Sequence, residues 1–137
     1  TGKPPSARAG HTATHVGEEL VIFGGSRGRK WENSVHTLDL TRWQWSRPKV
    51  VGHAPPGRSY ATATIIPGER MVLFGGNDDK KCFAEVSVLS RRADKSWQWL
   101  HPEVVGAAPA PRTGHAAVLL DDNRTVLIHG GWDPQDE

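Results

Sequence analysis

The chain has 137 residues, a formal net charge of +2, and a composition that is 36% hydrophobic and 23% charged. This balance is typical of a globular chain with a buried core and excludes an intrinsically disordered one. The positive charge is too small and too dispersed to predict a nucleic-acid partner, and no apolar run approaches the length of a membrane span. A single cysteine, Cys82, excludes an intrachain disulfide framework and favours a reducing compartment, the cytoplasm or the nucleus.

One pattern occurs three times along the chain. Each copy has an arginine, a short β-like segment and a pair of glycines, and the first glycines at 24, 75 and 130 are 51 and 55 residues apart. A period near 50 residues is the signature of a repeat architecture. The recurring residues, to which we assign a structural role, are Arg8, Arg58, Arg112, Gly24, Gly25, Gly75, Gly76, Gly130, Gly131, Trp45 and Trp99.

Each copy opens with two predicted strands. Alternating small and polar residues form the first strand, turn-forming residues follow it, and an apolar run then reaches the glycine pair. Glycine permits a positive φ and a close approach of neighbouring backbone, so we expect the pair to end the second strand. The first strands are predicted at 10–16, 60–66 and 114–120, and the second strands at 20–23, 71–74 and 126–128.

Two further strands complete the first two copies. Residues 34–40 and 84–89 predict the third strand, and the Trp-Gln-Trp sequences at 43–45 and 97–99 predict the fourth. Because the two tryptophans of each sequence share a strand face, we expect them to pack in the core between sheets. Proline-rich linkers to the next copy are predicted at 48–56 and 102–111.

The whole pattern resembles the kelch repeat of β-propellers: four strands in about 50 residues, a glycine pair after the second strand and tryptophan in the fourth. The resemblance implies an all-β fold, a segment of about two and a half four-stranded antiparallel blades. The blades are expected at about 1–48 and 49–102, with a half blade at 103–137. Closed propellers have four to eight blades. We therefore expect the remaining blades to come from the same polypeptide or from other copies.

The copies differ most in the loops after the glycine pairs, and residues that break a repeat are freer to be functional. Tyr60-Ala61 also replace the Gly-His of the other copies. By the resemblance, these loops and the start of the first strand border the mouth of the propeller channel, where peptides dock. Arginine suits carboxylates, so we expect an acidic or C-terminal peptide; the alternative is that Arg27, Arg29 and Lys30 form only a solvated loop. The expected partner-binding residues are Arg27, Arg29, Ser59, Tyr60, Lys80, Thr113 and Trp132.

Neither catalytic residues nor a bound cofactor is predicted. The sequence shows no constellation of nucleophile, base and orienting group, and no cysteine or histidine spacing typical of a metal site. We therefore expect a protein-interaction module rather than an enzyme. One alternative is a fragment of a copper oxidase related to galactose oxidase, with Tyr60 and Cys82 as the crosslinked pair, although a second tyrosine ligand is missing. The other is a purely structural scaffold segment.

The mouth assignment has a direct consequence for charge reversal. Reversal at Arg27 and Arg29 is expected to abolish binding of an acidic peptide. Reversal at Arg91 and Arg92 is expected to have no effect, because residues 91–95 are predicted to form an exposed turn.

Overall fold

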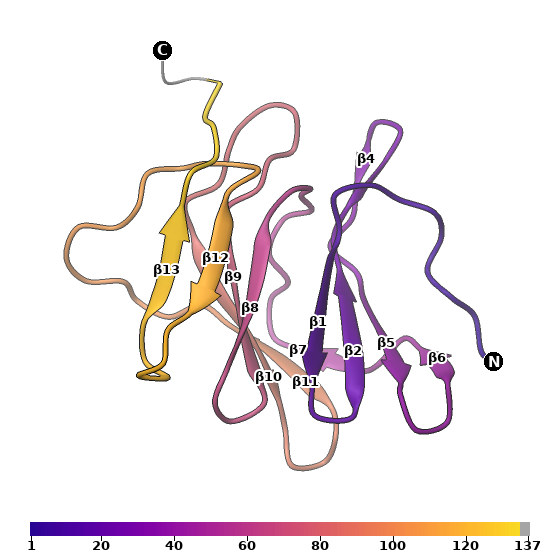
Figure 1. The fold of residues 1–137 in the computed structure, drawn as a ribbon. Helices are drawn as coiled ribbons and strands as arrows, with labels where there is room; N and C mark the ends of the chain where they lie inside the picture. Colours follow the sequence, from indigo (N-terminus) through magenta and orange to yellow (C-terminus); the bar gives the residue numbers. More distant parts are fainter. Residues whose placement is uncertain (135–137) are drawn as a thin grey trace.

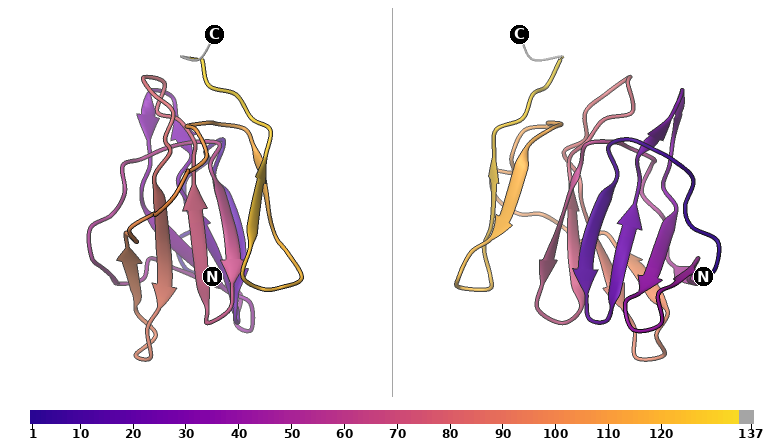
Figure 2. Two further views of the ribbon diagram at one scale, coloured as in Figure 1. Left: turned by 90° about the vertical axis from the view of Figure 1, so that its left-hand side faces the viewer. Right: turned by 45° about the vertical axis from the view of Figure 1, so that its right-hand side comes forward.

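The structure is a computed structural model that describes residues 1–134, so that residues 135–137 of the predicted half blade lie outside the described part. The regular secondary structure of this part is all β, as predicted, and the sheets stand side by side in an open arc (Figures 1 and 2). None of residues 1–134 belongs to a helix of the length and apolar character that crosses a membrane.

The strands form two complete blades and part of a third. Blade one contains β1 (Thr12–Val16), β2 (Glu19–Phe23), β5 (Val35–Asp39) and β6 (Gln44–Ser46), paired in that order. Blade two contains, in sheet order, β7 (Val50–Val51), β11 (Trp97–Leu100), β10 (Val86–Arg91), β9 (Arg70–Phe74) and β8 (Thr62–Ile66). The hairpin of β12 (Ala116–Leu119) and β13 (Val126–His129) is the partial blade three, and β3 (Ser26–Arg27) pairs with β4 (Lys30–Trp31) in the loop after the first glycine pair.

The two ends of the arc differ in their loops. The turns between the first and second strands of every blade lie at one end (Figure 1). The loops that follow the glycine pairs lie at the opposite end, together with the β3–β4 hairpin (Figure 1). We call this second end the mouth. Because each glycine pair ends a second strand, the loops that differ most between copies are brought to the same end of the molecule.

Blade two has a fifth strand that the sequence did not predict. Val50–Val51, in the predicted linker, forms β7 and pairs in parallel with β11, where Val50 faces Trp97. The Trp97 amide also donates to the Lys49 carbonyl at 3.0 Å. The N-terminus does the same in blade one, where the Trp45 amide donates to the Thr1 carbonyl at 2.8 Å. The N-terminal segment and the first linker thus cover the outer edges of blades one and two, edges that would otherwise expose unpaired backbone groups.

One apolar core holds blades one and two together. Phe23 of blade one meets Trp99 of blade two edge to face, with ring centroids 5.2 Å apart, a geometry that aromatic pairs favour. Alternate residues of β2 face blade two, because side chains on a strand point to opposite faces in turn. The buried core residues are Val16, Val21, Phe23, Val35, Met71, Leu73, Leu89, Trp97 and Trp99.

The prediction that both tryptophan pairs are core residues is wrong for the first pair. Trp97 and Trp99 are 0% and 3% exposed, whereas Trp43 is 64% exposed and Trp45 is half-buried. Trp97 and Trp99 face blade one, but the corresponding face of blade one has no neighbouring sheet within residues 1–134. Trp43 also lies in a turn before β6, with a left-handed φ of 52°. The repeat therefore fixes which face a residue points to, and its burial depends on the neighbouring blade.

The glycine pairs lie where one blade meets the next. The Gly25 amide donates to the Arg58 carbonyl at 2.8 Å, and the Gly76 amide donates to the Arg112 carbonyl at 2.9 Å. A Cβ on Gly24 would stand 2.8 Å from the Arg58 carbonyl oxygen, whereas one on Gly130 would meet no heavy atom within 4 Å in the described chain. The third glycine pair thus lacks the contact that the first two make, and blade three ends the arc with an open face.

The predicted exposed turn at 91–95 includes one residue that is not exposed. Arg91 is the last residue of β10, and its guanidinium forms an ion pair with Glu19 of blade one at 2.8 Å. Both side chains are mostly buried, and the guanidinium also lies over the Trp97 ring at 5.8 Å. Arg91 therefore links the two blades, and only Arg92 to Lys95 match the prediction of exposed residues.

Candidate functional site

Backbone hydrogen bonds form a continuous rim at the mouth. In each blade a backbone bridge joins the start of the first strand to the residue after the glycine pair. Blades are also joined to each other here, since the Tyr60 amide donates to the Gly10 carbonyl at 2.8 Å and the Gly114 amide donates to the Tyr60 carbonyl at 3.1 Å. Tyr60 is therefore the central residue of the rim. The three bridges are Ala9 to Ser26, Ser59 to Asn77, and Thr113 to Trp132.

Tyr60 adopts a backbone conformation that tyrosine rarely takes. Its φ is 60°, and the equivalent residues of the other copies are Gly10 and Gly114, with φ of 76° and 70°. A side chain in this left-handed region costs roughly 1–2 kcal/mol, which glycine avoids. The side chain is nevertheless 53% exposed, and Trp132 on the same rim is 65% exposed. The rim thus presents two large aromatic side chains to solvent.

Ser59 and Thr113 lie on the rim, but they are buried. Ser59 is 3% exposed and Thr113 is 7% exposed. The Asn77 side-chain amide donates to the Thr113 hydroxyl at 2.8 Å, and that hydroxyl donates to the Tyr60 carbonyl at 3.5 Å. These contacts hold the Tyr60 backbone in place and leave little hydroxyl surface for a ligand. Asn77, which the sequence reasoning missed, directly follows a glycine pair, and this position is the signal that could have identified it.

The predicted cations divide into two groups. Arg29 and Lys80 occupy equivalent positions, four residues after the second glycine of their pairs, and both are exposed. Arg27 instead forms an ion pair with Glu32 at 3.0 Å and lines a separate cavity of blade one with Arg8 and other basic side chains. The structure therefore brings Ser59, Tyr60, Thr113 and Trp132 together on the rim and directs Arg27 toward that cavity.

The three recurring arginines make the same two backbone contacts. In each copy the guanidinium donates to the carbonyl two residues earlier and to the carbonyl of the first glycine of the pair, at 3.0 to 3.2 Å. Arg58 goes further: it is 1% exposed, pairs with Glu85 at 2.5 Å and lies over the Phe83 ring at 3.9 Å. Burial lowers the pKa of Arg58, and the Glu85 carboxylate opposes this change. Each arginine thus fixes the end of the second strand to the start of the first.

His115 is a buried residue of the third copy rather than a mouth ligand. Its Nε2 is hydrogen-bonded to the Thr62 hydroxyl at 2.8 Å, and its ring meets the Phe74 ring edge to face with centroids 5.3 Å apart. It therefore connects the partial blade three to blade two. Burial, and then the charge of Arg112, lower the pKa of His115 below the ordinary value of 6.5.

This lowered pKa predicts a loss of stability in mild acid. The unfolded chain binds a proton at His115 more readily than the folded chain, so the free energy of unfolding is largest above pH 6.5 and falls as the pH drops through the lowered pKa. Denaturant melts between pH 7.5 and 5 should show this fall. His115→Gln should reduce the slope, and equal slopes in both proteins would contradict the assignment.

The thiol and the histidines do not form a metal centre in the described residues. Cys82 is buried, and its thiol lies 3.8 Å from the Trp132 carbonyl oxygen. Burial, and then the Asp133 carboxylate, raise the pKa of this thiol, which disfavours the thiolate needed by a metal ligand or nucleophile. Within residues 1–134 no three side chains of histidine, cysteine, aspartate or glutamate come together as a possible metal site.

Sheets that pack face to face around a common rim, with each first strand beginning at the mouth, define a segment of a β-propeller. The KLHDC2/KLHL20/DRC7 Kelch-repeats domain matches residues 1–131. The chain therefore belongs to the kelch-repeat family. Domains of this family are generally non-enzymatic protein-interaction modules, as the sequence predicted.

Several characterised proteins are similar to the chain over nearly its whole length. Acyl-CoA-binding domain-containing protein 4 of Arabidopsis thaliana is 38% identical over 96% of the chain. Kelch domain-containing protein 2 of Bos taurus is 32% identical over 96%, and serine/threonine-protein phosphatase BSL2 of Arabidopsis thaliana is 38% identical over 96%. The chain spans only 19%, 31% and 13% of the lengths of these three relatives.

Proposed function

We propose that the mouth of this kelch module binds an acidic or C-terminal peptide, with Tyr60 and Trp132 as the aromatic contact surface. The observation that carries the proposal is the strained tyrosine. Strain of this kind is retained where it serves a function, because the glycine of the other two copies would relieve it. Tyrosine and tryptophan also combine a large apolar area with a polar group and are enriched where proteins bind partners.

The exposed cations of the mouth loops are the groups that would attract an anionic partner, and Asp78, Asp79 and Asp133 of the same loops partly offset their charge. Arg29 and Lys80 lie in the loops that follow the glycine pairs at the mouth and are exposed. Arginine pairs with both oxygens of a carboxylate, and lysine adds a mobile positive charge. A peptide that carries a carboxylate next to an apolar residue matches this arrangement. The other possible role is that of a structural scaffold, in which the rim only joins the blades.

Completion of the ring is a second part of the proposal. The open face at Gly130 and the exposed Trp43 at the other end of the arc are the two surfaces that neighbouring blades would cover. Further blades from the same polypeptide, or from other copies of the chain, would supply the missing contacts. We propose the cytoplasm or the nucleus as the location, in keeping with the buried free thiol of Cys82.

Tyr60→Gly separates peptide binding from stability. The substitution restores the residue of the other copies, so the free energy of unfolding should stay constant or rise by roughly 1 kcal/mol. Affinity for an acidic peptide should fall by about tenfold or more, as expected when an aromatic contact residue is lost. Calorimetric titration and denaturant melts measure the two effects. Weaker binding with lower stability, or unchanged binding, would contradict the proposal.

Charge reversal tests the basic part of the mouth with a matched control. Arg29→Glu should weaken peptide binding, whereas Arg92→Glu should leave it unchanged because Arg92 lies at the opposite end of the blades. Arg91→Glu is unsuitable as a control, since it would break the ion pair with Glu19. Equal effects of Arg29→Glu and Arg92→Glu would show that only the overall charge matters.

A further inference from the structure

Blade one contains a basic cavity that is distinct from the aromatic rim. The cavity has a volume of about 430 Å³ and lies between the N-terminal segment, the β3–β4 hairpin, β5 and the end of β6. Five basic side chains and one carboxylate line it, together with His36, Ser34 and other uncharged residues. The charged residues are Lys3, Arg8, Arg27, Lys30, Arg47 and Glu32.

The one carboxylate of the lining is already paired. The Arg27 Nε donates a hydrogen bond to Glu32 Oε1 at 3.0 Å, and the Arg27 Nη2 forms an ion pair with the same oxygen at 3.0 Å. The Arg8 guanidinium donates hydrogen bonds to three neutral groups, each at 3.1 Å: the Ser6 carbonyl, the Ser6 hydroxyl and the Gly24 carbonyl. His36 lies in the same surroundings: its pKa is lowered first by burial and then by Arg8 and Arg47, and Glu32 opposes this change.

Blade two has a carboxylate at the position of the repeat that Ser34 occupies in blade one. Ser34 stands nine residues after the second glycine of its pair, and Glu85 stands nine residues after the second glycine of the next. Glu85 neutralises Arg58, the counterpart of Arg8, at 2.5 Å. Blade one therefore keeps the arginine and replaces its carboxylate by a serine hydroxyl.

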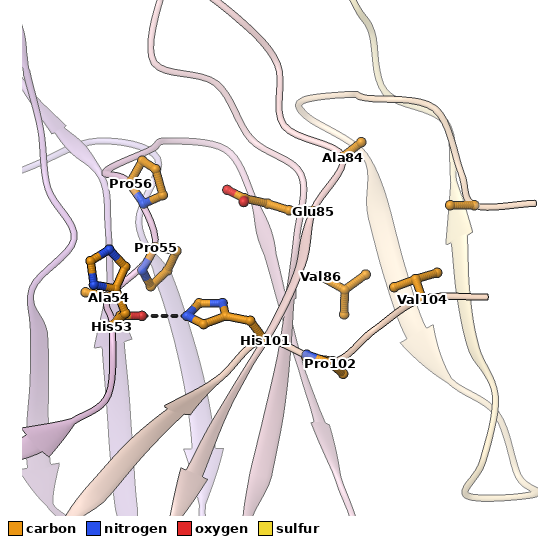
Figure 3. Close-up of a pocket in the computed structure, with 11 residues that line it drawn as sticks. His53, Ala54, Pro55, Pro56, Ala84, Glu85, Val86, His101, Pro102 and Val104 are labelled. Atoms are coloured by element: carbon orange, nitrogen blue, oxygen red, sulfur yellow. Dashed lines mark hydrogen bonds between the residues drawn. The ribbon is translucent and has the colours of Figure 1, made fainter.

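Two other wall positions change in the same direction. Lys3 and Arg47 of blade one correspond to His53 and His101 of blade two. In blade two the His101 ring is hydrogen-bonded to the His53 carbonyl, and Glu85 points toward the incoming linker at Pro56 (Figure 3). The blade-two cavity is therefore lined by apolar and internally paired groups, whereas basic residues line the one in blade one.

A missing neighbour accounts for the accessibility of Arg8 but not for the rest of the basic cavity. The blade-two cavity, of about 580 Å³, has a neighbouring blade on the side from which its linker enters, yet no residue of β1 to β6 lines it. Five of its wall positions correspond to positions in the basic cavity. These pairs are His53 with Lys3, Ala54 with Pro4, Pro56 with Ser6, Glu85 with Ser34, and His101 with Arg47. A blade that precedes blade one would by the same geometry bury Arg8, as blade one buries Arg58, and would leave these five wall positions open.

From these observations we infer that the cavity of blade one binds a phosphomonoester group, with Arg8, Arg47 and the Ser34 hydroxyl around its oxygens. A single carboxylate would serve Arg8 as Glu85 serves Arg58, but among residues 1–134 it would leave Lys30, Arg47 and Lys3 without a counter-charge in the cavity. A phosphomonoester carries close to two negative charges and three acceptor oxygens, which matches several basic donors around one cavity. The site goes beyond the peptide-binding mouth, because neither Tyr60 nor Trp132 lines it.

Ser34→Glu is the decisive variant. It installs the carboxylate that blade two uses, so the fold should persist, while phosphate binding should fall by about tenfold or more because the anion site is occupied. Ser34→Gln is the matched neutral variant: it removes the hydroxyl contact without adding a charge, so it should weaken binding by only about threefold, clearly less than Ser34→Glu. Arg47→Ser should weaken binding, and Arg92→Ser should not. Melting curves and affinity of a mouth peptide for each variant show that the fold and the mouth are intact.

The probes distinguish the source of the phosphate group. Inorganic phosphate, a nucleoside monophosphate and a neutral peptide with one phosphoserine are titrated, with the unphosphorylated peptide as the control, and His36 is followed by NMR. Bound phosphate should raise the pKa of His36, because it offsets the charges of Arg8 and Arg47. Tighter binding of the peptide would assign the site to a phosphorylated partner, and tighter binding of the nucleotide would assign it to a small phosphomonoester. Absence of binding, or binding that Ser34→Glu leaves unchanged, would overturn the inference.

Discussion

Arg58→Met is expected to lower the free energy of unfolding by about 3–5 kcal/mol, because it removes three hydrogen bonds of a buried guanidinium, one of them to the Glu85 carboxylate, which is 46% exposed. Arg58 is 1% exposed, and its guanidinium donates to the carbonyls of Pro56 and Gly75 as well as to Glu85. Methionine fills a similar volume, so the loss measures these polar contacts and the stacking on Phe83 rather than a cavity. Denaturant melts of the parent and the variant give the difference.

Arg8→Met is the matched control for this prediction. Arg8 makes the same two backbone contacts, at Ser6 and Gly24, but it is only half-buried and has no counterpart of the Glu85 pair. Its loss should cost about 1–2 kcal/mol, which is the range for a few hydrogen bonds near solvent. Equal losses at both positions would show that the carboxylate pair and the burial of Arg58 contribute nothing beyond the repeat contacts.

Gly75→Ala is the second large effect that we expect. The φ of Gly75 is +74°, and a Cβ there would lie 2.7 Å from the Arg112 carbonyl oxygen and would also meet the His115 ring. A left-handed alanine costs roughly 1–2 kcal/mol, and overpacking against fixed backbone adds roughly 1–3 kcal/mol. The total loss of about 2–5 kcal/mol should be visible in denaturant melts, together with weaker docking of blade three.

Gly130→Ala provides the control at the same position of the repeat. Its φ is +76°, nearly that of Gly75, but a Cβ there would meet no heavy atom within 4 Å in the described chain. Only the backbone cost of roughly 1–2 kcal/mol should remain. The difference between the two variants therefore measures contact between blades. If further copies of the chain complete the ring, Gly130→Ala should also reduce their association, and the two losses should become similar at high protein concentration.

The local parts of the fold could be predicted from the sequence because they depend on residues close together in the chain. Glycines that permit a positive φ, turn residues and alternating small side chains define the hairpins without knowledge of their neighbours. The parallel strand at Val50–Val51 could not be predicted in this way. Its partner, β11, is more than forty residues away, and its short apolar sequence looks like any segment of a linker.

The sequence predicted that the variable loops share one end of the molecule, but not the contacts that individual residues make there. Tyr60 stood out because it breaks a repeat of glycines, and the structure places it at the centre of the rim. The orientation of Arg27 away from that rim depends on its ion pair with Glu32, which only the β3–β4 hairpin creates. The sequence has Ser34 in blade one where blade two has Glu85. Only the structure shows that this carboxylate pairs with Arg58 and that Arg8 has no equivalent partner.

The sequence by itself determined the repeat, the all-β architecture and the end of the molecule at which the variable loops lie, because these follow from φ preferences and strand alternation within each copy. Only the tertiary structure decided which equivalent residues are buried, paired or exposed. Trp97 and Trp43 occupy the same position of the repeat, yet one is fully buried and the other is 64% exposed. The physical reason is that burial and ion pairing depend on contacts between blades, and equivalent residues of the repeat have different neighbouring blades along the arc.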